Sequence, residues 1–264
     1  MSIKDVRAVD LHAHYGIYYR EGKDLLNKLL SGDLETVVAR AKLANTCLTV
    51  VSSSHALTPR FKAKPVEGNA DASRRVREIE GLLHWVVVDP LVPETYKQAD
   101  DMLALPQCAG IKIHPEEHGY HISEHGRPLF EFARKHGALM IGHSGEERSM
   151  PEDFVPFTND FPDVRFILAH LGHGFDGDPS HQVRAIQASE SDNVYVDTSS
   201  SRSILSGLLE WAVGEIGAER IVFGTDNPLY FAPAQRARID NAGISDREKR
   251  LILCENAERL LNLK

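Results

Sequence analysis

The feature of this sequence that most constrains its fold is a regular alternation between short apolar runs and amphipathic stretches. Most of the runs are rich in Val, Ile and Leu and nearly continuously apolar, as in parallel strands covered on both faces. There are eight of them: Val6–His12, Thr46–Ser52, His84–Val88, Ala109–His114, Leu139–His143, Arg165–His170, Asn193–Thr198 and Arg220–Thr225. Strands that alternate with helices in this way form βαβ units and a parallel sheet.

The stretches between the runs carry helical signals. In Asp33–Ala44 and in Asp71–Leu83, the apolar side chains recur at the spacing of one helix face. Arg127–His136 has Pro128 at its expected first helical position and closes on a glycine. Ser245–Leu263 carries a stripe of leucine and isoleucine, and we expect it to be the closing helix.

Chain length and the end of the first strand select the architecture. The chain has 264 residues, which fits one (β/α)₈ barrel. A doubly wound open sheet usually has a Gly-rich phosphate-binding turn after its first strand, whereas this strand ends in Asp-Leu-His-Ala-His. We therefore predict an α/β fold in which residues 1–264 form a single (β/α)₈ TIM barrel. The one long loop, Ser54–Asn69, follows a strand and could cover the barrel mouth.

Net charge and composition exclude several classes of function. The formal net charge is -8 and no long run of Lys or Arg is present, which argues against nucleic-acid binding because that binding depends on neutralised phosphates. No apolar run approaches the roughly 20 residues that cross a bilayer, and the N-terminus lacks a basic, apolar leader. Cys47, Cys108 and Cys254 form no CxxC pair, so we expect free thiols. We predict a cytoplasmic protein with a small-molecule substrate, and we leave homo-oligomerisation open.

Titratable side chains gather where the predicted strands end. The first strand ends in His12 and His14, the fourth in Lys112 and His114, the fifth in His143, the sixth in His170 and the eighth in Asp226. In a parallel barrel these positions all lie at the carboxyl end, where active sites of the fold are built. Burial of such groups without partners costs several kcal/mol each. A common partner at this end of the barrel explains their presence.

His12 and His14 indicate that this partner is a metal ion. They lie two residues apart on a strand, so their side chains point to the same face. Imidazole and carboxylate ligands suit Zn²⁺ and neighbouring divalent ions. An HxH motif alone also occurs in ordinary histidine pairs. His143, His170 and Asp226 at three further strand ends favour the metal site.

The same segments resemble a known family. The stretches DLHAH, GIKIHP, MIGHSG, ILAHLG, NVYVDTS, IVFGTDNP and ENAERLL are similar to the amidohydrolase superfamily, in particular to its amidohydrolase-related branch. They occur in this order from Asp10 to Leu261, which is nearly the whole chain. The resemblance implies a metal-dependent enzyme with a TIM-barrel fold, but it does not imply a particular substrate.

The resemblance also implies a role for each strand-end residue. His12, His14, His143 and Asp226 would bind one divalent ion, with Zn²⁺ as the favoured identity. His170 would orient or deprotonate a metal-bound water, whose pKa the metal lowers toward 7. Asp226 could act both as a ligand and as a catalytic proton acceptor.

Lys112 and His114 leave the mechanism open. Two-metal relatives supply a carboxylated lysine or a glutamate from the fourth strand, so a second ion would require a modified Lys112. Alternatively, Lys112 binds a substrate carboxylate, or it is a core lysine paired with an acid such as Asp10. Arg60 and Arg202 are candidate anion clamps, because guanidinium matches carboxylate geometry. We favour one metal ion and assign Lys112, His114 and Arg202 to substrate binding.

Two classes of activity are consistent with these residues. Our leading hypothesis is metal-dependent hydrolysis of a small amide, lactone or ester. The alternative is non-oxidative decarboxylation or hydration of a small carboxylic acid at the same metal. A catalytically silent barrel that serves as a binding scaffold is more remote, because such a protein has little reason to keep these residues at its strand ends.

Overall fold

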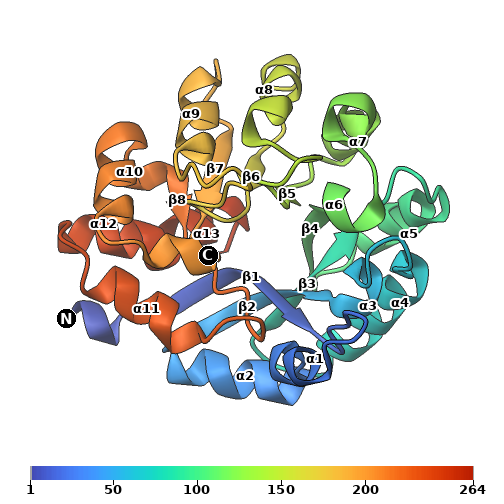
Figure 1. The fold of residues 1–264 in the computed structure, drawn as a ribbon, viewed down its shortest axis with the longest axis horizontal. Helices are drawn as coiled ribbons and strands as arrows, with labels where there is room; N and C mark the ends of the chain where they lie inside the picture. Colours follow the sequence, from blue (N-terminus) through green and yellow to red (C-terminus); the bar gives the residue numbers. More distant parts are fainter. Residues whose placement is uncertain (1, 264) are drawn as a thin grey trace.

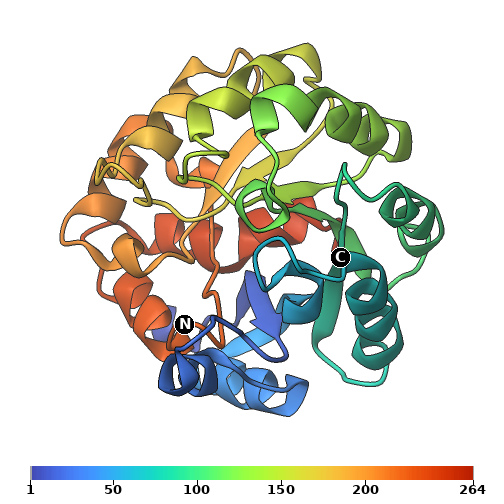
Figure 2. The ribbon, with the colours of Figure 1, turned by 45° about the vertical axis from the view of Figure 1, so that its right-hand side comes forward.

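The computed structural model describes residues 2–263 and shows eight parallel strands arranged as a nearly closed barrel (Figures 1 and 2). The strands are β1 (Ala8–Tyr15), β2 (Thr46–Ser53), β3 (Leu82–Val87), β4 (Cys108–Ile113), β5 (Met140–Gly142), β6 (Phe166–Leu168), β7 (Val194–Asp197) and β8 (Ile221–Val222). They pair in chain order. Backbone hydrogen bonds from Leu11 to Phe223 and from Thr225 to His12 join the first strand to the last. The predicted (β/α)₈ fold is confirmed.

Helices form a ring outside the strands (Figure 1). The longer ones are α2 (Leu34–Leu43), α4 (Pro65–Val76), α5 (Glu94–Met102), α7 (Ile122–His136), α8 (Pro151–Asp160), α9 (His181–Ala188), α10 (Leu208–Ile216) and α11 (Ala232–Asp240). Shorter elements are η1 (Ile3–Asp5), α1 (Asp24–Leu30), α3 (Ser54–Leu57), α6 (Pro115–His118), η2 (Ser201–Ile204) and η3 (Ala218–Arg220). The chain closes with α12 (Asp246–Arg250), the π-helical turn η4 (Leu251–Glu255) and α13 (Asn256–Leu260).

Two packed layers make the core. One cluster fills the barrel interior and includes Leu11, Trp85 and Ile141 together with Leu260 of α13. A larger cluster lies between the strands and the surrounding helices and includes Phe130 of α7. The barrel interior is therefore a packed core, as in other barrels of this type.

The largest difference from the predicted strands concerns β1. The predicted strand Val6–His12 is too short at its carboxyl end, because pairing continues from His14 to Ser52 and from Tyr15 to Ser53 of β2. His12 and His14 thus both lie within a paired strand. β5, β6 and β8 are shorter than their apolar runs, because apolar character marks a buried extended segment and does not show which residues pair.

Two predicted helices begin earlier than expected. The segment predicted as a long loop, Ser54–Asn69, contains α3 and the start of α4 at Pro65. A proline fits the first helical turn, where its missing N–H has no partner to lose. The predicted helix Asp71–Leu83 was also wrong at its end, since Leu82 and Leu83 belong to β3.

Helix α7 begins at Ile122, so Pro128 lies inside it and not at its first position. A proline inside a helix removes one backbone hydrogen bond. Burial of Ile122, Leu129 and Phe130 on one face stabilises α7 and offsets this cost. The predicted end of this helix is confirmed, because Gly137 caps it in the left-handed conformation.

Cys47, Cys108 and Cys254 are half-buried free thiols, as predicted. Within residues 2–263, no helix has the length and apolar character needed to cross a membrane.

Candidate metal centre and active site

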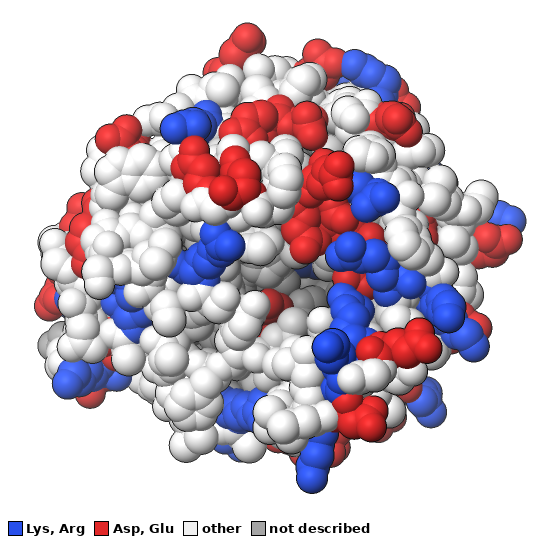
Figure 3. All heavy atoms as spheres, in the orientation of Figure 1, with Lys and Arg blue, Asp and Glu red and all other residues white. Residues whose placement is uncertain are grey.

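A pocket opens at the carboxyl end of the barrel and appears as a hollow near the centre of the face in Figure 3. It encloses about 810 Å³ of empty space, including its open mouth. The polar side chains that line it include His12, His14, Tyr18, Arg20, Arg60, His114, Glu117, His143, Glu146, His170, His173, Asp226 and Tyr230. The structure thus brings most of the predicted strand-end residues into one cavity.

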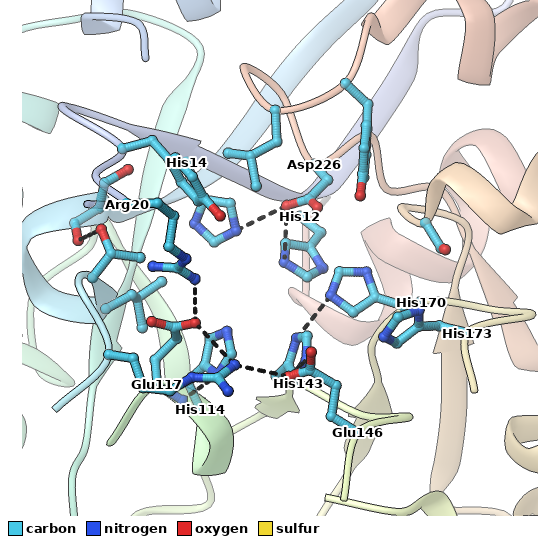
Figure 4. Close-up of a pocket in the computed structure, with 18 residues that line it drawn as sticks. His12, His14, Arg20, His114, Glu117, His143, Glu146, His170, His173 and Asp226 are labelled. Atoms are coloured by element: carbon cyan, nitrogen blue, oxygen red, sulfur yellow. Dashed lines mark hydrogen bonds and ion pairs between the residues drawn. The ribbon is translucent and has the colours of Figure 1, made fainter. Parts of the chain in front are cut away.

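Three of the predicted metal ligands converge in this pocket (Figure 4). Asp226 Oδ1 lies 2.9 Å from His14 Nε2 and 3.7 Å from His12 Nε2. One ligand atom from each of the three residues lies within 4.8 Å of the others, and all three side chains are buried. Two imidazoles and one carboxylate at the end of β1 and after β8 therefore form a compact cluster.

Unpartnered atoms in this cluster test whether it fits a metal ion. His14 Nδ1 and Asp226 Oδ1 are buried and make no hydrogen bond. The 2.9 Å approach between His14 Nε2 and Asp226 Oδ1 lacks hydrogen-bond geometry. Because buried polar atoms are normally paired, an unpaired Asp226 Oδ1 close to two imidazoles indicates a missing partner. The donor set of two nitrogens and an oxygen fits a divalent cation.

Asp197, at the end of β7, orients the first of these ligands. Its Oδ2 accepts a hydrogen bond from His12 Nδ1 at 2.7 Å, which leaves the lone pair of His12 on Nε2, facing the pocket. Asp197 Oδ1 also accepts from the backbone N–H of His170 at 2.9 Å. The sequence analysis assigned no role to Asp197, although its place at a strand end in NVYVDTS could have indicated one.

The protonation states of His12 and Asp226 are those of metal ligands. Burial, with Lys112 and neighbouring imidazoles adding to it, lowers the pKa of His12 well below its ordinary value. Burial also raises the energy of an ionised Asp226, but His14, His12 and Lys112 outweigh it and lower the pKa of that carboxyl. Metals bind neutral imidazole and ionised carboxylate, so no proton must leave these groups near neutral pH.

The backbone at the site is held in an unusual conformation. His170 and Asp226 have φ angles of +74° and +56°, in the left-handed region that side chains with a Cβ rarely adopt. Such residues cost about 1–3 kcal/mol each and persist where surrounding contacts hold them. Asp10 supplies such contacts, because it accepts hydrogen bonds from the N–H and hydroxyl of Thr225, beside Asp226. Burial raises the pKa of Asp10 to about 7.

His143 lies apart from the three-residue cluster. Its Nδ1 is 3.0 Å from His170 Nε2, and its Nε2 is 3.2 Å from Glu146 Oε2. With Glu146 and His173 it forms a second group whose ligand atoms lie within 4.8 Å of one another. The structure therefore places one imidazole, that of His170, between His143 and His12 (Figure 4).

Of the three residues assigned to substrate binding, only His114 lines the pocket. His114 lines the pocket and stacks on His143 with ring centroids 4.0 Å apart. Lys112 lies below the pocket, where its Nζ donates to His12 Nε2 at 3.0 Å; it does not pair with Asp10. Burial lowers the pKa of Lys112 to about 8. Arg202 is not among the residues that line the pocket.

Charged side chains from the segments after β1, β2, β4 and β5 also line the pocket, among them the labelled Arg20, Glu117 and Glu146 (Figure 4). Arg20 Nη2 donates to Glu117 Oε1 at 2.5 Å. Arg60 Nη2 lies 3.4 Å from the same oxygen and 3.5 Å from Glu146 Oε2. Arg20 and Glu117 were missed by the sequence analysis, because neither ends a strand and no local spacing relates them.

Comparison with known proteins gives a family and a fold. The family model described as amidohydrolase matches residues 49–263, in agreement with the resemblance seen in the sequence. No curated protein matches the chain.

Solved structures cover nearly the whole chain. A 2,6-dihydroxybenzoate decarboxylase complexed with 2,6-dihydroxybenzoate superposes with a TM-score of 0.75 at 16% identity, over 97% of this chain and 99% of that chain. A 5-carboxyvanillate decarboxylase from Sphingomonas paucimobilis gives 0.74 at 12% identity, over 98% and 99%. A dihydroxybenzoic acid decarboxylase from Polaromonas, with bound manganese and 2-nitroresorcinol, gives 0.73 at 15% identity, over 97% of both chains.

Proposed function

This chain belongs to the amidohydrolase family, and from that premise we propose that it is a metal-dependent decarboxylase of a small carboxylic acid. The observation that carries the proposal is one pocket that holds both a metal-type cluster and two guanidinium groups, Arg20 and Arg60. Guanidinium is the side chain best matched to a carboxylate. The likeness to three decarboxylases supports this choice over hydrolysis. A small substrate and a cytoplasmic setting, without a nucleic-acid partner, remain part of the proposal.

The metal would be held by His12, His14 and Asp226, with His143 proposed as the fourth ligand. The nitrogen-rich set favours Zn²⁺, whereas the Polaromonas decarboxylase holds manganese. When bound, a divalent ion would supply a Lewis acid that polarises a substrate oxygen. Elemental analysis of protein purified without added metal would identify the ion.

The protein side chains would handle the proton of the reaction. In decarboxylation the bond between the carboxyl carbon and its neighbour breaks, CO₂ leaves, and a proton from solvent joins the remaining carbon. His170 Nε2 lies 3.0 Å from His143 Nδ1, and His170 Nδ1 lies 2.7 Å from Ser199 Oγ. His170 lines the pocket and is held by these contacts, so it would pass a proton from a pocket water to the vacated carbon. Arg20 and Arg60 would hold the acid in place.

Hydrolysis is the second candidate, and one observation favours it. Burial, together with neighbouring His12 and His143, lowers the pKa of His170 well below its ordinary value. A neutral imidazole beside the cluster can accept a proton from an attacking water. The two candidates thus use the same residues but different substrates.

Substrate panels separate these candidates. Metal-loaded protein would be incubated with aromatic and aliphatic carboxylic acids, with CO₂ release and solvent deuterium at the vacated carbon as readouts. A second panel of lactones, esters and amides would be followed by acid release. We expect turnover in the first panel. Turnover in the second panel alone would establish hydrolysis, and bound metal without turnover in either would favour a scaffold.

Metal stoichiometry tests the proposal of one ion. A single ion predicts a metal content near one per chain that persists in Lys112→Ala and His170→Asn. Two ions would require a carboxylated Lys112 and would make His170 a ligand. A content near two that falls to one in both variants would contradict the single-ion mechanism.

A further inference from the structure

Lys112 places a cation beside the proposed metal ligands. It lies on β4 and is 1% exposed, and its Nζ lies 3.0 Å from His12 Nε2. Lys112 does not line the pocket, so this contact is made below the cavity. Because burial of an ammonium group without a partner is costly, the contact with His12 is part of how the site is built.

The hydrogen bonds of His12 fix which of its nitrogens can accept. Nδ1 donates its hydrogen to Asp197 Oδ2 at 2.7 Å. Burial lowers the pKa of His12, so the ring is neutral and carries a single N–H. Nε2 is therefore an acceptor with one lone pair, which lies in the plane of the ring. The ammonium of a lysine can only donate, so Lys112 donates to this lone pair.

A metal ion bound to His12 needs the same lone pair. Imidazole nitrogen binds Zn²⁺ through it at about 2.0–2.1 Å. An ion at that distance would overlap an ammonium nitrogen that lies 3.0 Å from the same Nε2, and two cations so close would also repel each other. His12 Nε2 can therefore serve Lys112 or a metal ion, but not both at once.

We infer that Lys112 competes with the metal ion for His12 Nε2, so that it weakens metal binding and must turn away before His12 can coordinate the ion. The inference rests on the metal site of the proposed function and not on the reaction. Asp197 and Asp226 both attract the ammonium of Lys112, so it keeps a compensating charge when it leaves His12. The site thus carries its own competitor, which sets how tightly the ion is held.

Lys112→Met tests the competition through metal affinity. Methionine has a similar unbranched shape but neither an N–H donor nor a charge, so it frees His12 Nε2. Wild type and variant would be stripped of metal and titrated with Zn²⁺ or Mn²⁺ against a chelator of known affinity. We expect the variant to bind the ion roughly 10- to 100-fold more tightly, which is the range of a hydrogen bond to a charged group. Structural damage would have the opposite effect, because it would weaken the site.

Lys249→Met is the matched control. Lys249 is also buried, at 8% exposed, but its Nζ donates to the backbone oxygen of Asp240 at 2.9 Å. Removal of this cation should leave metal affinity unchanged. Lys112→Gln keeps an N–H donor but loses the charge, so its affinity should lie between those of the wild type and Lys112→Met. Thermal unfolding would show that each variant is folded, and Lys112→Gln decides the test if Lys112→Met does not fold.

Unchanged or weaker metal binding in the folded Lys112 variants would overturn the inference, and weaker binding would indicate that Lys112 helps to hold the ion. An equal gain in Lys249→Met would also overturn it, because the effect would then be one of overall charge. Failure of the proposed function has a different signature, since the gain in affinity would remain while no acid in the panel releases CO₂. Wild-type protein that binds neither Zn²⁺ nor Mn²⁺ would overturn the metal site and this inference together.

Discussion

Buried histidines occur toward both ends of the barrel, and they differ in what surrounds them. At the carboxyl end, His12 Nδ1 donates to Asp197, and its Nε2 faces Asp226 and Lys112. In the first half of β3, toward the amino end, His84 is fully buried and neither ring nitrogen has a partner. Burial lowers the pKa of His84 to about 4, and that of His12 is also lowered well below its ordinary value.

The comparison shows that burial makes a histidine neutral but does not make it a ligand. A neutral imidazole becomes a ligand when one nitrogen is oriented by a carboxylate and the other meets further donors. The strand ends can provide this, because polar residues from several strands meet there. The register partners of His84 on the neighbouring strands are Val51 and Cys108, and neither ring nitrogen of His84 has a hydrogen-bond partner.

We expect the largest loss of metal and activity from removal of Asp226, the carboxylate that faces His12 at the carboxyl end of the barrel. Asp226→Ala deletes the only acid in the three-residue cluster, so it should lose most bound metal and nearly all activity. Elemental analysis and turnover of the purified variant would measure this. Asp163→Ala, which changes an exposed acid of the α8–β6 loop, should leave both unchanged. A fully loaded Asp226→Ala protein would show that the cluster is not the metal site.

His170→Asn should separate catalysis from metal binding. If His170 moves the proton and does not bind the metal, activity should fall by roughly 10²–10⁴-fold while the metal content stays the same. Rate and metal content would be measured on the same preparation. His173→Asn, which alters a pocket histidine without a contact to Ser199, should have a smaller effect on rate. Parallel loss of metal and rate in His170→Asn would instead make His170 a ligand.

Asp197→Asn should have an intermediate effect. The amide keeps the size of the side chain but removes the charge that orients His12, so metal affinity should fall by roughly 10- to 100-fold. Competition with a chelator of known affinity would measure it. Unchanged affinity would mean that the carboxylate adds nothing beyond burial, and the distinction between His12 and His84 would no longer hold.

His84 should affect the free energy of unfolding at acidic pH, but it should not affect metal binding or turnover. Its pKa in the folded protein, about 4, lies below the ordinary value of 6.5. Between these values the unfolded chain binds a proton that the folded chain does not, so stability falls as the pH is lowered through this window. From pH 7 to pH 5 the loss from this group is about 2 kcal/mol.

His84→Leu isolates that contribution. Urea unfolding at pH 7 and pH 5 should show a pH-dependent loss smaller by this amount in the variant than in the wild type. Metal content and turnover should be unchanged, because His84 lies in the other region of the barrel. An identical pH dependence in both proteins would show that His84 is not a buried neutral imidazole.

Local sequence determined the elements of this protein and the residue types at their ends. Apolar runs and amphipathic stretches predicted the barrel, because side-chain periodicity depends only on neighbours along the chain. The HxH spacing placed His12 and His14 on one face, and the structure has Asp226 beside them. Strand and helix limits were less accurate, as Pro65 and Pro128 show, because burial decides where a helix can begin.

Only the tertiary structure decided which side chains meet. Asp197 orients His12 across 185 residues of sequence, and Glu117 pairs with Arg20 across 97 residues. The same holds for His143, which has the expected position but contacts His170 and Glu146 in this structure. These contacts depend on the paths of loops after different strands, and no local periodicity encodes such a path. The sequence alone could therefore predict a cluster at the strand ends, but not the carboxylate that orients it.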